Sequence, residues 1–550
     1  MQQTYLSSST NKNGASGSRW RQRFNGWLPA ILLFFVFTLC ILPLFPLIGS
    51  WNDIEAGLWQ HLWQTELPQL FTNTILLIVL VGSASFLLGV GLAWLVVMYD
   101  FPGRGILQWG LMLPLAIPPY ILAFVVLGFT DFGGPMQHAL NTIGLGIEWL
   151  PDMRSPFGVS LVFTLSLYPY VYLLMRSALQ RKGRSSYESA RTLGYGKIAA
   201  FWKLVLPLTR PAWVAGLALV LMETLADFGA VSIFNFNTFT TAVYKSWYGF
   251  YSQNTAAQLA CLLLLFVTLA VLAEKWGRGQ GRYEQSGAAL KQYRQKLTGG
   301  WGVFAQVLAW SVFSLGFILP VIQLIVWSVS SFERHTEGTL NLLVNTVTLA
   351  VLAALLTLMI AAIVVWAQRQ KNSKPRAVMG EFSQLGYAMP GTVLAVGLMM
   401  ALNIIDGWIA DIVNEKGQWL ATGLFALLLA YVIRFLRIGF GPLSSSMGQI
   451  KPSIIETAGI LGAGKRERLF RVYIPLLRPG VLTALLLVFV EVMKEMPATL
   501  ILRTYGWDTL AIRIYELSSE GEWELTALPA IMLVAVGIIP VILLIKKSEL

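Results

Sequence analysis

The chain has 550 residues, of which 56% are hydrophobic and only 12% charged, and it carries a formal net charge of +12. This composition holds more apolar surface than a soluble core can bury, so it excludes a soluble globular protein and predicts an integral membrane protein. The apolar runs are continuous and about 20 residues long, which favours membrane-spanning helices over the alternating ten-residue strands of a barrel. The basic residues lie between these runs, so membrane topology explains them better than nucleic-acid binding does.

Twelve apolar runs are long enough to cross a membrane, and they predict an all-α fold of twelve transmembrane helices. The first run follows a polar tail with basic residues, like the start of a signal peptide, but it is long and lacks a small-residue cleavage site. It is therefore expected to be an uncleaved first span. The predicted spans are residues 28–48, 70–98, 107–128, 157–178, 211–236, 258–274, 303–328, 343–367, 385–405, 420–440, 479–502 and 525–545.

The basic residues are distributed unevenly between the two sides of these spans. If the N-terminus is inside, 33 of the 40 Lys and Arg fall in inside segments or at the inside ends of the neighbouring spans and six fall in outside loops, with Lys494 left within a span. By the positive-inside rule, both termini are expected in the cytoplasm.

A stretch of 24 residues occurs twice, at 188–211 and 456–479, and both copies fall in the most basic inside segments. The copies align without a gap. They share Glu188 with Glu456, Ala190 with Ala458, Gly194 with Gly462, Lys197 with Lys465, Pro207 with Pro475 and Pro211 with Pro479. Matches 272 residues apart, such as Asn73-Thr74 with Asn345-Thr346, extend the repetition to the preceding spans.

The repetition predicts two homologous halves of six spans each. Because six is even, both halves enter the membrane in the same direction and are related by an axis along the membrane normal. The expected organisation is a cytoplasmic tail at 1–27, a first half at 28–274, a cytoplasmic connector at 275–302 and a second half at 303–550.

The duplicated stretch has the residues of a helical hairpin on the membrane surface. Gly194 and Gly462 permit the left-handed backbone that ends a helix, and a proline downstream limits the next helix. In the second copy Ile454, Ala458 and Leu461 form an apolar stripe, which suits docking into a groove of a cytoplasmic partner. A loop that only packs against its own spans is the alternative, and the duplication disfavours it.

A phosphate-loop spacing inside the second copy is not expected to bind nucleotide. The segment from Gly459 to Lys465 has the required glycines and lysine, but Arg466 replaces the Ser or Thr that would hold Mg²⁺ and no strand precedes it. The energy for any active transport is therefore expected to come from a separate ATPase.

The pattern Glu-x-Ala-x-x-x-Gly, with Pro 19 residues after Glu, resembles the signature loop of the inner-membrane permeases of binding-protein-dependent ABC importers. That resemblance implies a type I importer permease in a bacterial inner membrane, whose two loops dock into two copies of a cytoplasmic ATPase subunit. It also implies a periplasmic or extracellular substrate-binding protein as partner. Glu188, Ala190, Gly194, Glu456, Ala458 and Gly462 would be the coupling residues.

Residues 222–249 and 491–521 look like the iron(III) branch of the family. Ser189 and Thr457 depart from the usual second Ala, but both are small.

Four acidic residues fall inside predicted spans, Glu223 and Asp227 in one half and Glu491 and Glu495 at the matching places in the other. The i, i+4 spacing predicts that each pair shares one helix face. Ionisable residues at such depth usually face a watery path, and carboxylates suit hard cations, so these four are candidates for the translocation path. The alternative is structural: Lys494 could neutralise a neighbouring acid, or the acids could be hydrogen-bonded links between helices.

The remaining reactive residues do not form a recognisable site. Cys40 and Cys261 lie in apolar runs and are expected to pack, while His61, His138 and His335 are scattered over outside loops. No enzymatic site, cofactor or nucleic-acid partner is predicted. Membrane lipid is the expected surrounding partner. A secondary transporter remains the competing class, and thiamine, a polyamine or another small solute the competing cargo.

Overall fold

The computed structural model describes residues 14–149, 152–278, 294–297, 299–334, 338–370, 373–415 and 417–548. Ten helices in this part are long and apolar enough to cross a membrane, or up to 12 if two bent helix pairs each count as one span. The only strands in the described ranges are the two-residue β1 (Tyr99–Asp100) and β2 (Gln295–Lys296), which pair in parallel. The predicted all-α membrane fold is confirmed.

The residues group into two compact units that do not follow the two halves of the sequence. One unit takes the described residues up to Leu42 together with Ala353–Tyr387 and Tyr431–Val488, and the other takes the rest. Each unit is described separately below.

The smaller unit contains α1, α19, α22 and α23, and parts of α18, α21 and α24. Their bounds are α1 (Gly14–Ile41), α18 (Thr339–Gln370), α19 (Lys374–Phe382), α21 (Leu424–Gln449), α22 (Pro452–Ile460), α23 (Lys465–Arg468) and α24 (Ile474–Lys494). Helix α1, from the first half, packs on α19 of the second half, where the rings of Phe37 and Phe382 meet edge to face at 6.3 Å. Helices α21 and α24 approach closely at Gly480, where a Cβ would lie 2.7 Å from the carbonyl oxygen of Pro442.

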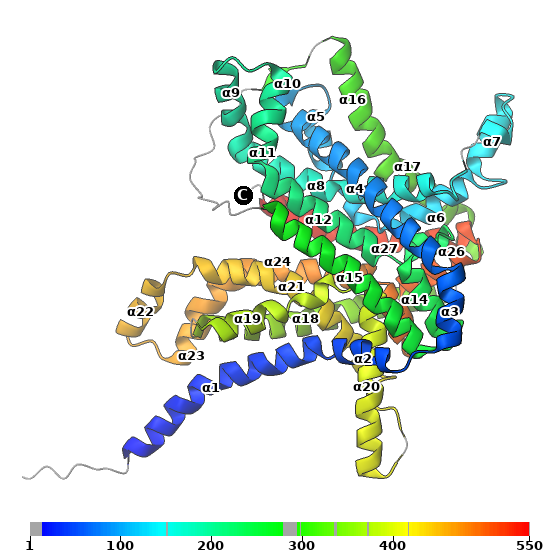
Figure 1. Cartoon of the computed structure of the whole chain (residues 1–550). Helices are drawn as coiled ribbons and strands as arrows, with labels where there is room; N and C mark the ends of the chain where they lie inside the picture. The colour runs from blue at the N-terminus through cyan, green and yellow to red at the C-terminus, as the bar shows by residue number, and fades with distance from the viewer. Residues whose placement is uncertain are drawn as a thin grey trace, which may run out of the picture. The chain divides into compact units, whose positions relative to one another are not determined.

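The larger unit contains most of the first half and parts of the second (Figure 1). Its first-half helices are α2 (Leu44–Gly49), α3 (Ala56–Thr65), α4 (Leu67–Met98), α5 (Arg104–Gly110), α6 (Pro119–Thr130), α7 (Pro135–Thr142), α8 (Pro156–Ala178), α9 (Arg184–Thr192), α10 (Lys197–Ala200), α11 (Leu206–Leu208), α12 (Arg210–Ala226), α13 (Gly229–Ile233), α14 (Phe239–Tyr248) and α15 (Gln253–Arg278). Its complete second-half helices are α16 (Gly300–Phe313), α17 (Leu319–Ser330), α20 (Gly391–Val413), α25 (Pro497–Leu502), α26 (Leu510–Ser519) and α27 (Trp523–Ser548).

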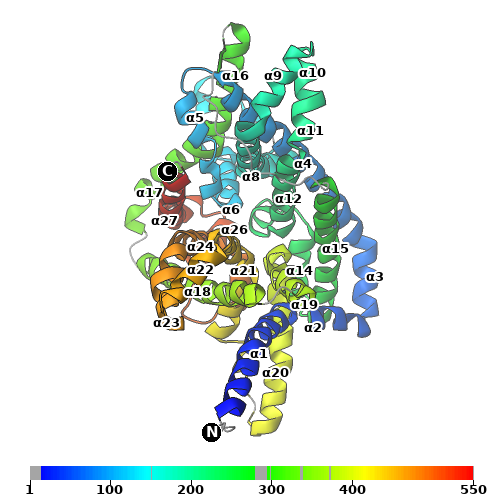
Figure 2. The same cartoon turned by 90° about the vertical axis from the view of Figure 1, so that its left-hand side faces the viewer.

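Three long helices, α4, α8 and α12, form the centre of this unit (Figures 1 and 2). They meet at Val171 of α8. A Cβ on Gly89 of α4 would lie 2.6 Å from the Cβ of Val171, and one on Gly216 of α12 would lie 2.7 Å from its Cα. Only glycine fits at both positions, so these two residues set how closely the helices pack.

The halves exchange helices inside the larger unit as well. Helices α16 and α17, which begin the second half, pack on α5 and α6 of the first half. In the other direction α2 packs on α20, and a Cβ on Gly397 would lie 2.4 Å from the carbonyl oxygen of Pro43. The two halves are therefore intertwined rather than juxtaposed.

Three predicted spans are broken. The first is interrupted between Ile41 and Leu44, at Pro43, which cannot donate a backbone hydrogen bond. The predicted continuous span 211–236 is wrong, because α12 ends at Ala226 and α13 follows from Gly229. The predicted span 479–502 is likewise divided, into α24 and α25.

Candidate functional site

The duplicated stretch folds into a helical hairpin in each half, as predicted. The first arm is α9 in one copy and α22 in the other. Both arms end before a glycine in the left-handed conformation, Gly194 with a φ of 87° and Gly462 with a φ of 85°.

The end of the first arm explains the spacing between the Ala and the Gly of the motif. In the first copy Tyr195 N donates to the carbonyl of Ala190, and Gly194 N donates to that of Arg191, both at 3.1 Å. The second copy repeats both bonds, from Ala463 to Ala458 at 3.0 Å and from Gly462 to Gly459 at 3.1 Å. This pair of bonds is the Schellman ending of a helix, in which the left-handed position favours glycine. A helix, rather than a strand, precedes the phosphate-loop spacing, so its fold is not that of a phosphate loop.

Large apolar side chains are exposed at the turn of each hairpin. Leu193 is 76% exposed and its counterpart Leu461 is 81% exposed. Glu188 and Glu456 are exposed beside them. Of the predicted apolar stripe, Ile454 and Leu461 are exposed while Ala458 is partly buried. Exposed leucines at equivalent places of two copies are typical of a surface that another protein covers.

The second arms of the two hairpins differ. Both contain a five-residue π-helical turn, Phe201–Val205 or Leu469–Tyr473. In the first copy the chain then bends by 72° at Thr209 before α12, whereas residues Arg466–Lys494 of the second copy qualify as one unbroken span. The hydroxyl of Thr209 donates to the carbonyl of Val205 at 2.9 Å, which closes the helix before the bend.

The acidic pairs do not share helix faces, so that prediction is wrong. Glu223 lies in α12, but the helix ends at Ala226 and Asp227 has an extended backbone. Glu491 lies in α24, which ends at Lys494, just before Glu495. Glu223 and Glu491 are each partly buried. The side chain of Lys494 donates to the carbonyl of Leu115 at 2.9 Å.

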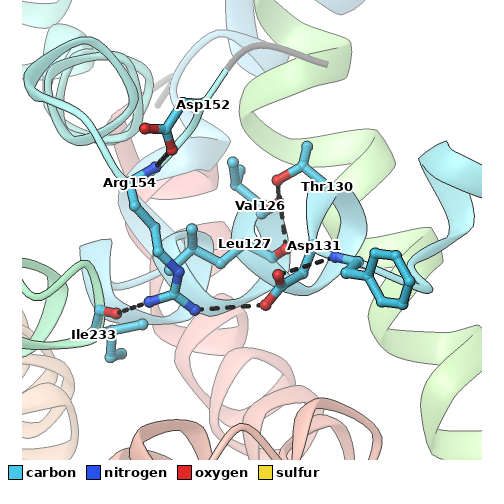
Figure 3. A network of polar contacts seen from close by, with 8 residues as sticks. Val126, Leu127, Thr130, Asp131, Asp152, Arg154 and Ile233 are labelled. Atoms are coloured by element: carbon cyan, nitrogen blue, oxygen red, sulfur yellow. Dashed lines mark hydrogen bonds and ion pairs between the residues drawn. The ribbon is translucent and has the colours of Figure 1, made fainter. Parts of the chain in front are cut away.

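Asp227 lies just before the short helix α13 that follows the break. Its Oδ1 accepts hydrogen bonds from Ala230 N at 2.8 Å and Val231 N at 3.4 Å. At the other end of α13, the guanidinium of Arg154 donates to the carbonyl of Ile233 at 3.4 Å (Figure 3). An acid at the start and a cation at the end both stabilise a helix.

Arg154 also connects this helix to the end of α6. Its Nη2 lies 3.4 Å from Oδ2 of Asp131, and its backbone N–H donates to Asp152 at 2.9 Å (Figure 3). The loop before α8, the end of α6 and the end of α13 are therefore held by one side chain. From the sequence alone, Arg154 was only one of the six basic residues in the predicted outside loops.

Glu495 has the equivalent role in the second half. Its Oε1 accepts a hydrogen bond from Ala498 N at 3.0 Å, at the start of α25. The side chain is only 6% exposed, and a Cβ on Gly391 would lie 2.5 Å from the same oxygen. A glycine at the start of α20 is therefore needed to make room for this carboxylate.

The two breaks lie next to each other, one from each half. A Cβ on Gly229 would lie 2.5 Å from Cε of Met496 and 2.8 Å from Cβ of Tyr120. Tyr120 is 3% exposed, and its hydroxyl has no hydrogen-bond partner within the described residues. Sequence reasoning missed Tyr120, because no pattern distinguishes it from the other tyrosines in apolar runs.

The matching Asn residues of the two halves hold the short helices beyond the breaks. Asn73 donates to the carbonyl of Asn237 at 2.8 Å, just before α14. Asn345 donates to the carbonyls of Gly506 and Asp508 at 3.0 and 3.2 Å, just before α26. The sequence revealed that the two Asn residues correspond. It did not reveal their hydrogen bonds, because each bond joins residues that are more than 160 positions apart in the chain.

An aromatic cluster joins α13, α14 and α26 next to the breaks. The ring of Phe228 lies 4.8 Å from that of Tyr244 and 5.4 Å from that of Tyr515, and the hydroxyl of Tyr515 lies 3.2 Å from that of Ser232. Burial, together with the neighbouring Tyr515, raises the pKa of Tyr244 to about 12. This phenol is therefore neutral at physiological pH.

The histidines remain scattered where they are described. His61 lies in α3 and His138 in α7, whereas His335 lies outside the described residues. Within those ranges no three His, Cys, Asp or Glu side chains come together as a metal site. Cys40 and Cys261 are free thiols, and Cys40 is buried.

The sequence of the chain matches one protein family twice, over residues 85–276 and again over residues 358–548. The family is described as the binding-protein-dependent transport system inner membrane component. Each match contains one hairpin, one long helix that carries an acidic residue and ends at a break, and the short helix that follows the break. The duplicated features are therefore those of two complete family domains.

Several characterised relatives resemble the chain. The Fe(3+)-transport system permease protein FbpB 2 of Haemophilus influenzae is 29% identical over 95% of this chain and 98% of its own length. The ferric transport system permease protein FbpB of Actinobacillus pleuropneumoniae is 24% identical over 84% of this chain and 68% of its own length. The molybdenum transport system permease protein ModB of Escherichia coli is 27% identical, but over only 39% of this chain and 92% of its own length. The chain thus belongs to the inner-membrane permeases of binding-protein-dependent ABC importers and carries two copies of their domain in one polypeptide.

Proposed function

We propose that this permease forms the complete membrane pathway of an ATP-driven importer of iron(III). The observation that carries the proposal is the similarity to FbpB 2, which extends over nearly the whole of both chains. The molybdenum permease aligns with less than half of this chain, as one family domain would. A cargo such as molybdate, thiamine or a polyamine is correspondingly disfavoured.

The hairpins are proposed to dock into two copies of an ATPase subunit. Their support is the exposed Leu193 and Leu461 beside Glu188 and Glu456, on helices that end in the same way. In this role Ala190, Gly194, Ala458 and Gly462 fix the end of each docking helix, while the exposed residues make the contact. Closure of the two ATPases on ATP would then draw the hairpins together and change the access to the pathway.

The four acids are proposed to lie along the path with two different tasks. Glu223 and Glu491 are partly buried in the long helices and would attract the cation. Asp227 and Glu495 accept hydrogen bonds at the starts of the short helices beyond the breaks. They would keep the two long helices interrupted at this point of the path. The neutral aromatic cluster of Phe228, Tyr244 and Tyr515 would close the path beside the short helices that follow the breaks.

The orientation follows from charge, because the basic segments carry the hairpins. Both termini and the connector 275–302 are proposed to be cytoplasmic, with the halves at 28–274 and 303–550. A substrate-binding protein would deliver the cargo to the opposite face, and lipid would cover the apolar flanks. Transport without bond chemistry on the permease is the simplest mechanism that this arrangement supports.

The acids provide the test of the proposed path. Glu223→Gln and Glu491→Gln should each lower ferric uptake at least about tenfold while leaving the stability and the ATPase binding unchanged, because only the charge is lost. Glu415→Gln is the control. It removes an exposed charge just after the end of α20 and should leave uptake unchanged. Normal iron uptake in both path variants would contradict the proposed path.

A further inference from the structure

A small cavity lies beside the first turn of α14 in the larger unit. Helices α4 and α15 each pack on both α12 and α14, and residues from all four helices line the cavity. The space open to the centre of a water molecule is about 10 Å³. One water molecule needs about this much space, so the cavity has room for one small ligand only.

Four of the nine residues that line the cavity are threonines, and none of the nine is charged. Three of these threonines have already used their proton. Thr224 donates to the carbonyl of Val220 at 2.8 Å, and Thr240 donates to the carbonyl of Asp227 at 2.7 Å. Because the proton of Thr240 is used in this way, Thr238 must be the donor in the 2.9 Å bond between the two hydroxyls.

The fourth threonine, Thr74 of α4, is only 4% exposed, and its hydroxyl has no hydrogen-bond partner within the described residues. Phe239 lines the same cavity and is the first residue of α14, so no carbonyl of its own helix can accept its N–H. A buried polar group without a partner is costly, and the cavity offers a place where both groups could find one.

The second half of the chain shows what the equivalent two groups do when they meet directly. Thr346 matches Thr74, and Leu510, the first residue of α26, matches Phe239 at nearly the same spacing. Leu510 N donates to Oγ1 of Thr346 at 2.9 Å, and the hydroxyl of Thr346 donates to the carbonyl of Leu342 at 2.7 Å. In the first half the cavity stands in place of this direct bond.

The residues that line the cavity determine which ligand fits. They include no cation that could pair with an anion, and the positive end of a helix dipole at Phe239 disfavours a metal cation. Water can accept from the N–H of Phe239, exchange a hydrogen bond with the hydroxyl of Thr74 and donate to a remaining lone pair of Thr224. Buried waters typically make about three such bonds.

We propose that one water molecule occupies this cavity and joins Thr74 of α4 to the first turn of α14. It replaces in the first half the direct bond between Thr346 and Leu510. Helix α14 carries Tyr244 of the aromatic cluster, so the water helps to hold one side of that cluster. The site does not involve the cargo, so its test and the test of iron(III) import can fail separately.

Substitution of Thr74 distinguishes a hydrated cavity from a dry one. Thr74→Val removes the hydroxyl that holds the water and leaves the N–H of Phe239 without a partner. The midpoint of thermal unfolding of the full chain in detergent should therefore fall by about 1 to 3 °C. In a dry cavity the same change would only remove an unpaired buried hydroxyl, so a midpoint that stays or rises would overturn the proposal.

Two other threonines are matched controls. Thr346→Val breaks the direct bond to Leu510 and should lower the midpoint by a similar amount. Thr164 of α8 is also 4% exposed and its hydroxyl lacks a partner among the described residues, but it does not line this cavity. Thr164→Val should leave the midpoint unchanged or raise it. An equal decrease at Thr74 and Thr164 would attribute the effect to any buried hydroxyl and would count against the water.

A cryo-electron microscopy map of the full chain that resolves ordered water provides the direct measurement. Density should lie within about 2.7 to 3.2 Å of both Oγ1 of Thr74 and the backbone N of Phe239. It should be present in sodium chloride and in potassium glutamate alike. A map that shows other buried waters but no density here would overturn the proposal, and density in only one of the two salts would identify an ion instead.

Discussion

At the scale of single residues, the four intramembrane acids divide into two kinds that the sequence does not separate. Glu223 and Glu491 lie within helices, whereas Asp227 and Glu495 accept backbone hydrogen bonds where a new helix starts. The signal for the second kind was present, since Pro497 follows Glu495 by two residues and proline favours the first turn of a helix. The apolar runs concealed it, because they continue through both breaks.

The capping role of Asp227 can be separated from a role of its charge. Asp227→Asn keeps an oxygen that can accept from Ala230 N, so its thermal stability should match that of the wild type. Asp227→Ala removes the acceptor and should lower the free energy of unfolding by about 1 kcal/mol. Thermal unfolding in detergent measures both. Equal loss of stability in the two variants would show that the charge, rather than the cap, matters.

The glycines of the coupling motif allow a second test at this scale. Gly194→Ala and Gly462→Ala each force alanine into a left-handed backbone, at a cost of about 1 to 2 kcal/mol. The hairpin should distort, and transport-coupled ATP hydrolysis should fall.

Gly407→Ala is the matched control for the glycines. Gly407 lies inside α20, has nothing within 4 Å of the place where a Cβ would stand and has no positive φ, so alanine should fit there without loss of stability. Undiminished coupling in both hairpin variants would contradict the role assigned to the left-handed turn.

At the scale of elements, the hairpin is the part that the sequence predicts best. Its glycine and proline punctuation is local, so residues a few positions apart determine where each arm ends. The 72° bend at Thr209 was not predictable in the same way, because both copies carry the flanking prolines, Pro207 and Pro211 or Pro475 and Pro479, yet the second copy stays unbroken. The copies differ at Thr209 itself, which Leu477 replaces and whose hydroxyl donates to the carbonyl of Val205, but a single threonine does not by itself predict a bend.

Docking of the hairpins can be tested by placing a charge on the exposed apolar turn. Leu193→Asp and Leu461→Asp should each reduce co-purification of the ATPase about tenfold, because an exposed leucine that is buried in a groove contributes roughly 1.5 kcal/mol or more. Ile412→Asp, at an 81% exposed position at the end of α20, is the control and should not affect ATPase binding. ATPase binding that survives in the double variant would exclude these turns as the contact.

At the scale of the whole molecule, the spans and the two homologous domains were predictable, but the packing units were not. Hydrophobicity and internal repetition identify where helices cross the membrane and which ones correspond. They do not reveal that α16 and α17 pack on first-half helices, because that contact depends on tertiary geometry. Glycines such as Gly89 and Gly216 show their purpose only once the facing Val171 is seen.

The central claim is that this fused permease imports iron(III) with energy from a separate ATPase. The most direct measurement is uptake of radioactive ferric iron into proteoliposomes that contain the full chain and its ATPase, with the ferric substrate-binding protein on the accessible side. Uptake is predicted to require ATP and the binding protein, to be inhibited by vanadate and to be unaffected by excess molybdate or sulfate. Uptake that proceeds without ATP, or accumulation of molybdate in place of iron, would contradict the account.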